Sequence, residues 1–153
     1  LMQPMLVDRV EDDQGKTLIQ YVPQKVRRVV ERATARKMVV ALRKVVTKDG
    51  TARRARLENY SVAGKTGTAQ KPIRGGYSHS KFFSSFVGFF PADSPELCIS
   101  VVLDEPKRPS YYASLTAAPA FRRIAERAAK YLALKPDLTG SDGRVVARVD
   151  TGR

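Results

Sequence analysis

Apolar segments bounded by turn-forming residues mark the expected strands of this chain. A glycine-containing turn, Asp12-Asp13-Gln14-Gly15, separates the first two and predicts a hairpin. The last strand is hydrophobic from Leu97 to Leu103 at every position except Ser100, which predicts a strand that is central or covered on both faces. Residues 72–77 are rich in turn formers and predict a loop. The expected strands are residues 4–11, 16–22, 60–70, 81–90 and 96–104.

Two other segments repeat hydrophobic residues at helical spacing. Residues 31–46 should form a helix that Thr34 caps if it starts late and that ends at Asp49-Gly50. Residues 113–134 should form a second helix, with Pro119 in its first turn or at a kink. The expected buried stripes are Met38, Val39, Leu42, Val45 and Val46 in the first helix, and Phe121, Ile124, Ala125, Ala128 and Leu132 in the second.

This order of elements predicts an α+β fold. The three later strands are joined by short connections, which favours an antiparallel meander with the second helix packed across it. Residues 1–138 are expected to belong to one domain. Residues 139–153 are polar and contain three glycines, so we expect a flexible tail.

Composition narrows the possible partners. The chain has 153 residues, 42% of them hydrophobic, and a formal net charge of +13. No apolar run approaches the roughly 18–20 residues that span a bilayer, and the first residues do not resemble a signal peptide. The positive charge favours anionic partners, but the basic residues fall mainly on the polar faces of the expected helices and frame no nucleic-acid module. We therefore expect a solvated basic surface and no nucleic-acid partner.

The single cysteine and the single histidine carry little chemistry. Cys98 lies in an expected strand and is interpreted as a small core residue. His79 is interpreted as a solvated loop residue. With so few ligating side chains, neither a metal site nor another cofactor is expected.

The sequence Lys65-Thr66-Gly67-Thr68 lies in the expected strand 60–70 and places a cation, two hydroxyls and a glycine together. A lysine ammonium stabilises developing negative charge, and a hydroxyl can bind a substrate carboxylate. Gly67 would allow a substrate backbone to lie against the strand as an added strand. Lys-Thr-Gly is one of three motifs of penicillin-interactive serine enzymes.

Five ordered segments, within residues 17–134, resemble the C-terminal part of the transpeptidase domain of class B penicillin-binding proteins, the peptidoglycan D,D-transpeptidases of cell division and elongation. Such a likeness is much more specific than the Lys-Thr-Gly motif alone. The segments are Val45-Val46 with Gly50-Thr51-Ala52, then Val62 to Gln70, Phe86-Val87-Gly88-Phe89-Phe90-Pro91-Ala92, Val101-Val102-Leu103-Asp104-Glu105-Pro106, and Tyr111-Tyr112 with Ala117-Ala118-Pro119-Ala120-Phe121.

The resemblance implies a serine acyl-enzyme that cross-links D-Ala-D-Ala stem peptides and is trapped by β-lactams. It assigns substrate binding to Lys65, Thr66, Gly67 and Thr68. Lys65 would bridge toward a Ser-x-Asn element, and the Thr68 N–H would be an oxyanion donor while its hydroxyl binds the carboxylate. Thr66, on the other face of the strand, would be more structural. The parent would work at the extracytoplasmic face of the membrane, anchored outside this chain, with other cell-wall synthesis proteins as possible partners.

The chain departs from the family pattern at the nucleophile. Nothing upstream of Lys65 reads Ser-x-x-Lys, and no Ser-x-Asn occurs anywhere. Ser78-His79-Ser80-Lys81 matches the Ser-x-x-Lys pattern by chance, because it lies downstream of the Lys65-Thr66-Gly67-Thr68 box. We therefore expect residues 1–138 to be the C-terminal part of a transpeptidase domain that is inactive alone. The alternatives are a non-catalytic module that binds an anionic wall polymer or a partner protein, and a D,D-carboxypeptidase or β-lactamase remnant.

Overall fold

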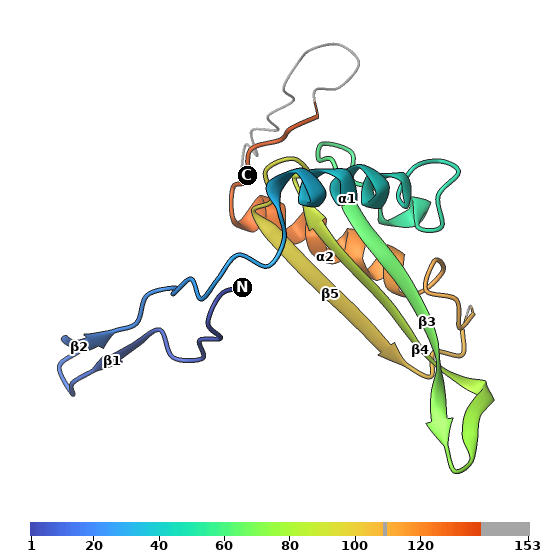
Figure 1. Ribbon diagram of the computed structural model, residues 1–153, viewed down its shortest axis with the longest axis horizontal. Coiled ribbons are helices and arrows are strands. Elements are labelled where there is room, and N and C mark those ends of the chain that lie inside the picture. Colours follow the sequence, from blue (N-terminus) through green and yellow to red (C-terminus); the bar gives the residue numbers. More distant parts are fainter. Residues whose placement is uncertain (109, 139–153) are drawn as a thin grey trace, which may run out of the picture. The chain divides into compact units, whose positions relative to one another are not determined.

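The structure is a computed structural model, which describes residues 1–108 and 110–138 (Figure 1). It consists of two compact units, Leu1–Arg36 and the part that begins at Lys37, and each is described by itself. The predicted tail, 139–153, lies outside the described residues. Among the described helices, none has the length and apolar character needed to cross a membrane.

The first unit contains one small hairpin. β1 (Arg9–Glu11) pairs antiparallel with β2 (Thr17–Gln20), as the turn at Asp12 predicts. The Asp12 carboxylate accepts hydrogen bonds from the N–H groups of Gln14 and Lys16, which closes the turn. Both strands are shorter than expected because their hydrophobic side chains are exposed on the two-stranded ribbon and gain little by extending it.

The helix α1 (Arg32–Lys44) confirms the expected first helix, with differences at its ends. Thr34 lies inside the helix, so the proposed cap is wrong. The chain turns after Lys44, and a β-carbon at Gly50 would lie 2.3 Å from the Lys44 carbonyl oxygen, so only glycine fits there. Of the expected stripe, Val46 just beyond the helix is buried, whereas Met38 is exposed.

The second unit contains a three-stranded antiparallel sheet in the order β3–β4–β5, which confirms the predicted meander. Its strands are β3 (Ala63–Ile73), β4 (Gly76–Phe90) and β5 (Leu97–Asp104). The expected loop at 72–77 is wrong. β3 and β4 continue to a two-residue turn in which Gly75 has φ +85°, and Pro72 is tolerated beside a bulge in an outer strand.

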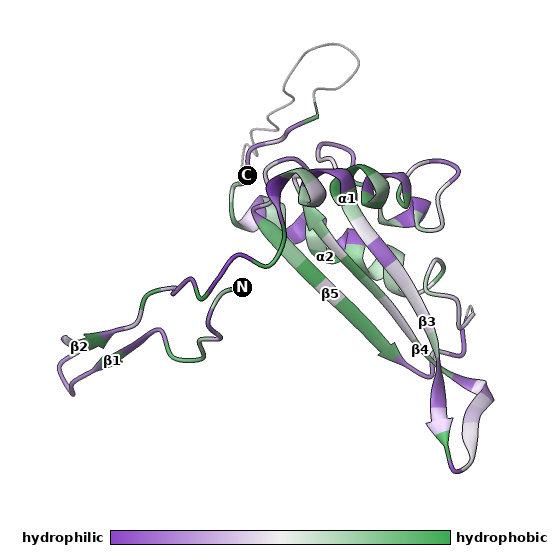
Figure 2. Cartoon of the chain, viewed as in Figure 1, coloured by the Kyte–Doolittle hydropathy of each residue, from purple (hydrophilic) through white to green (hydrophobic). Residues whose placement is uncertain are grey.

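The structure corrects the expectation for the last strand. β5 lies at an edge of the described sheet, not at its centre. Its side chains alternate between a face packed in the core and an exposed face that carries Cys98 and Val102. The interpretation of Cys98 as a core residue is therefore wrong. In Figure 2, β5 is hydrophobic along most of its length, whereas β3 carries more polar residues.

The helix α2 (Ala117–Tyr131) covers one face of the sheet and supplies much of the core. The Phe121 ring meets Phe86 and Phe90 edge to face, with centroid separations of 4.8 and 6.3 Å. Pro119 lies in the first turn, where its missing N–H costs nothing, as predicted. Ala125 is buried as expected, whereas Ile124 is exposed because it lies beyond the edge of the buried stripe.

Candidate functional site

The Lys-Thr-Gly-Thr box lies in the first half of β3, on a strand as predicted. β3 is the outermost strand on its side of the described sheet, so one of its edges has no strand beside it. Such an edge presents unpaired main-chain groups that can bind an extended peptide.

The direction of the main-chain groups follows from the hydrogen bonds of β4. The carbonyls of Phe82 and Phe90 accept hydrogen bonds on the β5 side, from the N–H groups of Glu105 and Glu96. Because these directions alternate along a strand, even-numbered residues of β4 bond toward β5 and odd-numbered ones toward β3. Thr68 pairs with the even-numbered Ser84. The N–H of Thr68 therefore points away from β4, out of the free edge of β3.

The side chains of the box divide between the two faces of the sheet. Thr66 and Thr68 pair with Phe86 and Ser84, and so lie on the face that carries α2. Lys65 lies on the opposite face, where it is exposed and its Nζ donates a 2.8 Å hydrogen bond to the Thr66 carbonyl. Thr66 was expected on a different face of the strand from Lys65 and Thr68, but in the structure the two threonines share a face.

Two segments distant in sequence frame these threonines. The Thr66 hydroxyl lies 3.3 Å from the hydroxyl of Thr51, in the connector after α1. The Thr68 hydroxyl accepts a 3.3 Å hydrogen bond from the N–H of Ala113, just before α2. Thr51 was not among the predicted site residues, although its position in the Gly-Thr-Ala segment was a signal for it.

The segment that precedes α2 packs against β4 at Phe82 and Ser84. The Tyr111 ring stacks on Phe82 with a centroid separation of 4.3 Å, and the Tyr111 carbonyl accepts a hydrogen bond from Ser84. The hydrogen bond to Tyr112 raises the pKa of Tyr111, so the phenol stays neutral. These contacts give Tyr111 a structural role and fix the loop that reaches Thr68.

Lys71, in β3, forms ion pairs with two residues at the C-terminal end of β5. Its Nζ lies 2.7 Å from Asp104 Oδ1 and 2.8 Å from Glu105 Oε1, and 4.8 Å from the centroid of the Phe83 ring. These hydrogen bonds raise the pKa of Lys71, and Lys71 in turn lowers the pKa of Glu105. Asp104 and Glu105 therefore serve the sheet as partners of Lys71.

The Ser-x-x-Lys match at residues 78–81 has the wrong setting for a nucleophile. Ser78 lies in β4 rather than at a helix start, and its Oγ accepts hydrogen bonds from the N–H groups of Ser80 and Lys81. His79 is in the same strand, not in a loop as expected, and it is exposed. Within residues 1–108 and 110–138, no cluster of His, Cys, Asp and Glu has the makings of a metal site.

Comparison with known proteins gives consistent matches. The family model described as the penicillin binding protein transpeptidase domain matches residues 1–126. The probable peptidoglycan D,D-transpeptidase PbpC of Pseudomonas aeruginosa is 38% identical over 122 residues, which are 79% of this chain and 22% of that protein. Stage V sporulation protein D of Bacillus subtilis is 38% identical over 121 residues, which are 79% of this chain and 19% of that protein. The chain thus spans about a fifth of the length of these curated relatives.

Solved structures give the same match. The transpeptidase domain of Burkholderia pseudomallei penicillin-binding protein 3 aligns with a TM-score of 0.69 and 33% identity, over 76% of this chain and 35% of that one. Penicillin-binding protein 3 of Mycobacterium tuberculosis in complex with ampicillin aligns with a TM-score of 0.72 and 30% identity, over 85% of this chain and 30% of that one. The resemblance inferred from the sequence is confirmed, and so is the partial α+β fold.

Proposed function

The chain belongs to the penicillin-binding protein transpeptidase family, and from this we propose that it supplies the substrate-docking edge of a peptidoglycan D,D-transpeptidase. The observation that carries the proposal is the free edge of β3. There the Thr68 N–H points outward, and the hydroxyls of Thr66 and Thr68 lie together on one face. A peptide that ends in a carboxylate can pair with this edge and place its terminal group beside the hydroxyls.

Three residues of the box have proposed chemical roles. The Thr68 N–H stabilises the oxyanion of the tetrahedral intermediate, and a donor of this kind typically contributes about 2.7–4 kcal/mol. The hydroxyls of Thr68 and Thr66 bind the substrate carboxylate, since both lie on the same face. Lys65 carries a positive charge on the opposite face, from which it can assist proton transfer at the nucleophile.

The nucleophile is proposed to be a serine in the part of the parent protein that this chain does not include. Its Oγ attacks the carbonyl of the penultimate D-Ala of a stem peptide. The bond to the terminal D-Ala breaks, and that residue leaves as an amine after taking up a proton. An amine of a neighbouring stem peptide then displaces the serine and forms the cross-link. A β-lactam would stop at the acyl stage, and the parent would act outside the cytoplasmic membrane.

The proposal is tested by labelling the complete parent protein with a fluorescent penicillin. Lys65→Ala should abolish labelling, because it removes the cation next to the acylating serine. Lys81→Ala removes an equal charge from the same hairpin and should leave labelling unchanged. The 153-residue chain alone should not be labelled.

Three outcomes would contradict the proposal. Unchanged labelling of the Lys65→Ala parent would remove Lys65 from the site. Labelling of the isolated chain, lost in Ser78→Ala, would locate the nucleophile in β4. A parent that no penicillin labels would favour a non-catalytic module that binds an anionic wall polymer or a partner protein.

A further inference from the structure

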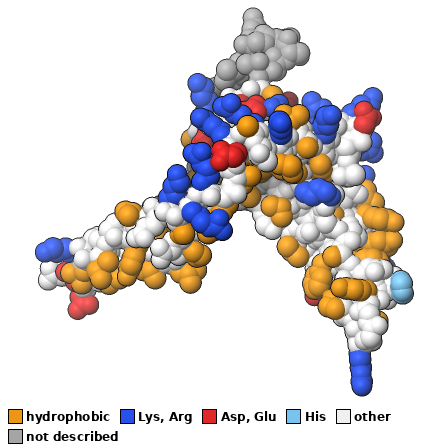
Figure 3. All heavy atoms as spheres, in the orientation of Figure 1, with side chains coloured by type: hydrophobic (Ala, Val, Ile, Leu, Met, Phe, Trp, Pro, Cys, Tyr) orange, Lys and Arg blue, Asp and Glu red, His pale blue; other side chains and the backbone are white. Residues whose placement is uncertain are grey.

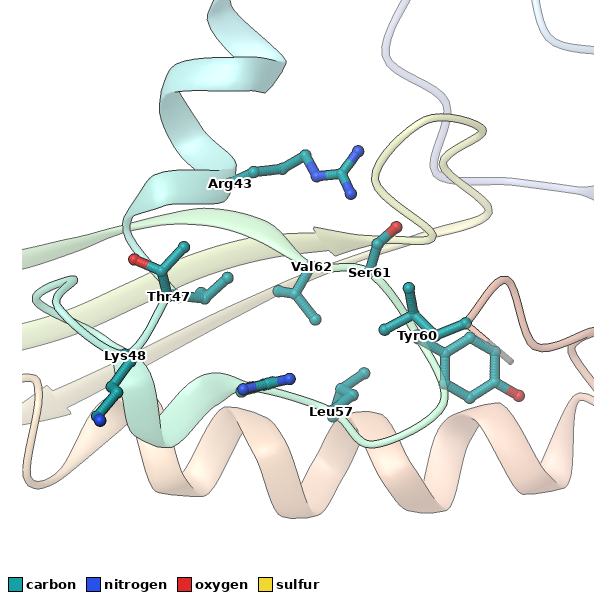
Figure 4. Close-up of a pocket in the computed structure, with 10 residues that line it drawn as sticks. Arg43, Thr47, Lys48, Leu57, Tyr60, Ser61 and Val62 are labelled. Carbon is teal, nitrogen blue, oxygen red and sulfur yellow. The ribbon is translucent and has the colours of Figure 1, made fainter. Parts of the chain in front are cut away.

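A hollow in the second unit lies away from the box. It has a volume of about 270 Å³ and lies between the end of α1, the connector that follows it and the start of β3 (Figure 4). Arg43 reaches over it from α1, while Leu57 and Tyr60 approach it from the connector. This space is lined by Arg43, Val46, Thr47, Lys48, Arg56, Leu57, Tyr60, Ser61, Val62 and Leu138.

The floor of the hollow is apolar and firmly packed. Val46, Leu57 and Val62 are at least nine-tenths buried and belong to the main core. The Tyr60 ring packs edge to face on Phe90 at 5.5 Å, and its hydroxyl donates to the Leu134 carbonyl. This floor is therefore a fixed apolar surface with its polar groups already satisfied.

The rim of the hollow is cationic. Three lining residues, Arg43, Lys48 and Arg56, are positively charged, and none of the ten is acidic. Arg43 is held by Asp93 at 2.7 Å. Among residues 1–108 and 110–138, no ion pair involves Lys48 or Arg56. These two side chains are thus available to an anion.

A basic surface by itself does not indicate a ligand, because exposed Lys and Arg side chains are hydrated. Lys and Arg side chains gather over α1 and its surroundings in Figure 3, and Arg53 and Arg54 extend the same charge along the connector. The hollow differs from this surface because its cations surround an apolar floor. Its volume equals that of roughly nine waters at about 30 Å³ each, which suits a headgroup and the first carbons of a chain better than a whole drug-sized ligand.

We propose that this hollow binds a phosphate-bearing amphiphile, with the phosphate at Lys48 and Arg56 and the adjoining apolar group on the floor. Guanidinium and ammonium groups are the usual protein partners of phosphate. The apolar lining selects a lipid phosphate over a free phosphate ion, because only the lipid covers the part of this lining that water still reaches. The site is independent of acyl transfer at the box.

The test is isothermal titration of the complete parent protein with monomeric dihexanoyl phosphatidylglycerol. The variant Lys48→Gln/Arg56→Gln should bind it at least tenfold more weakly. The matched control Arg53→Gln/Arg54→Gln has the same change of charge on neighbouring residues that do not line the hollow, and should bind within about twofold of the native protein. Thr47→Phe fills the hollow without changing the charge and should abolish binding.

Two further probes distinguish a site for a lipid phosphate from a site for a free phosphate ion. Inorganic phosphate and dihexanoyl phosphatidylcholine should each bind at least tenfold more weakly than the anionic lipid. The proposal is overturned if inorganic phosphate binds equally well or if both double variants lose the same affinity, which would show a diffuse charge effect. Absence of binding by the folded parent would also overturn it.

Discussion

Gly64, the residue before Lys65, tests the packing that holds the box strand in place. A β-carbon at this position would lie 2.6 Å from Phe86 Cζ and 2.6 Å from the Val87 carbonyl oxygen. The Phe86 ring is fully buried and packed against Phe121, so it cannot move aside. Gly64→Ala should therefore force β3 away from β4.

The expected cost can be set against a matched change in the same strand. Overpacking of this kind typically costs about 1–3 kcal/mol. Each kcal/mol lowers Tm by roughly 2–4 °C for a chain of this size, so Gly64→Ala should lower Tm by roughly 2–12 °C. At Gly67 a β-carbon would approach only one atom this closely, the Ser85 hydroxyl at 2.6 Å. That hydroxyl can rotate, and alanine restricts the unfolded chain, so Gly67→Ala should change stability by less than about 1 kcal/mol.

The assay is thermal unfolding of the 153-residue chain followed by circular dichroism. Phe86→Leu removes the ring that an alanine at position 64 would strike. The loss in the double variant Gly64→Ala/Phe86→Leu should therefore be smaller than the sum of the two single losses. The reasoning fails if Gly64→Ala unfolds within 1 °C of the native chain, or if Gly67→Ala is the more damaging change.

Three further changes probe the core, the ion pairs and a buried hydroxyl. Phe121→Ala should cost about 3–5 kcal/mol in urea unfolding, because it empties the space between α2 and the sheet; a loss below 1 kcal/mol would contradict the packing. Lys71 lowers the pKa of Glu105 from 4.5. The stabilisation from the Lys71–Glu105 ion pair is therefore complete above pH 4.5 and is lost as the pH falls through the lower pKa that Glu105 has in the folded chain. Lys71 itself has a pKa raised above 10.5, so its share is lost as pH rises through that higher value. Lys71→Met should destabilise the chain more at pH 7 than at pH 3, and an equal loss at both would refute the pairing. Ser61→Ala should lower the free energy of unfolding, measured in urea, by about 1–3 kcal/mol, because the buried Ala92 N–H loses its acceptor. An unchanged urea midpoint would show that this N–H has another acceptor.

The meander and its covering helix were predictable because each depends on local sequence pattern. A strongly apolar run closed by turn-forming residues identified β4, short connections indicated the meander, and helical spacing identified the Phe121 side of α2. The loop at 72–77 was mispredicted because turn-forming residues do not reveal how tight a turn is, and here Gly75 completes it in two residues. For β5, the pattern shows how much apolar surface the strand can bury, but not which neighbours cover it.

The box was visible in the sequence, but its surroundings were not. Thr68 meets Ala113, 45 residues away, and Lys71 meets Asp104, 33 residues away. Such contacts depend on how the sheet is ordered, which residue types and spacings do not reveal. The pairing of Thr66 and Thr68 on one face, in contrast, follows from strand alternation alone.

The three directions in which β3 presents its groups limit where a nucleophile can lie. The Thr68 N–H points out of the edge, the two hydroxyls lie on the α2 face and Lys65 lies on the other. In the proposed mechanism the oxyanion lies about 2.7–3.1 Å from the Thr68 nitrogen, so the reacting carbonyl would sit beside the edge rather than over either face. In the proposed reaction, the serine adds to this carbonyl from above or below the plane of the added strand, so it lies next to the edge on a segment outside this chain.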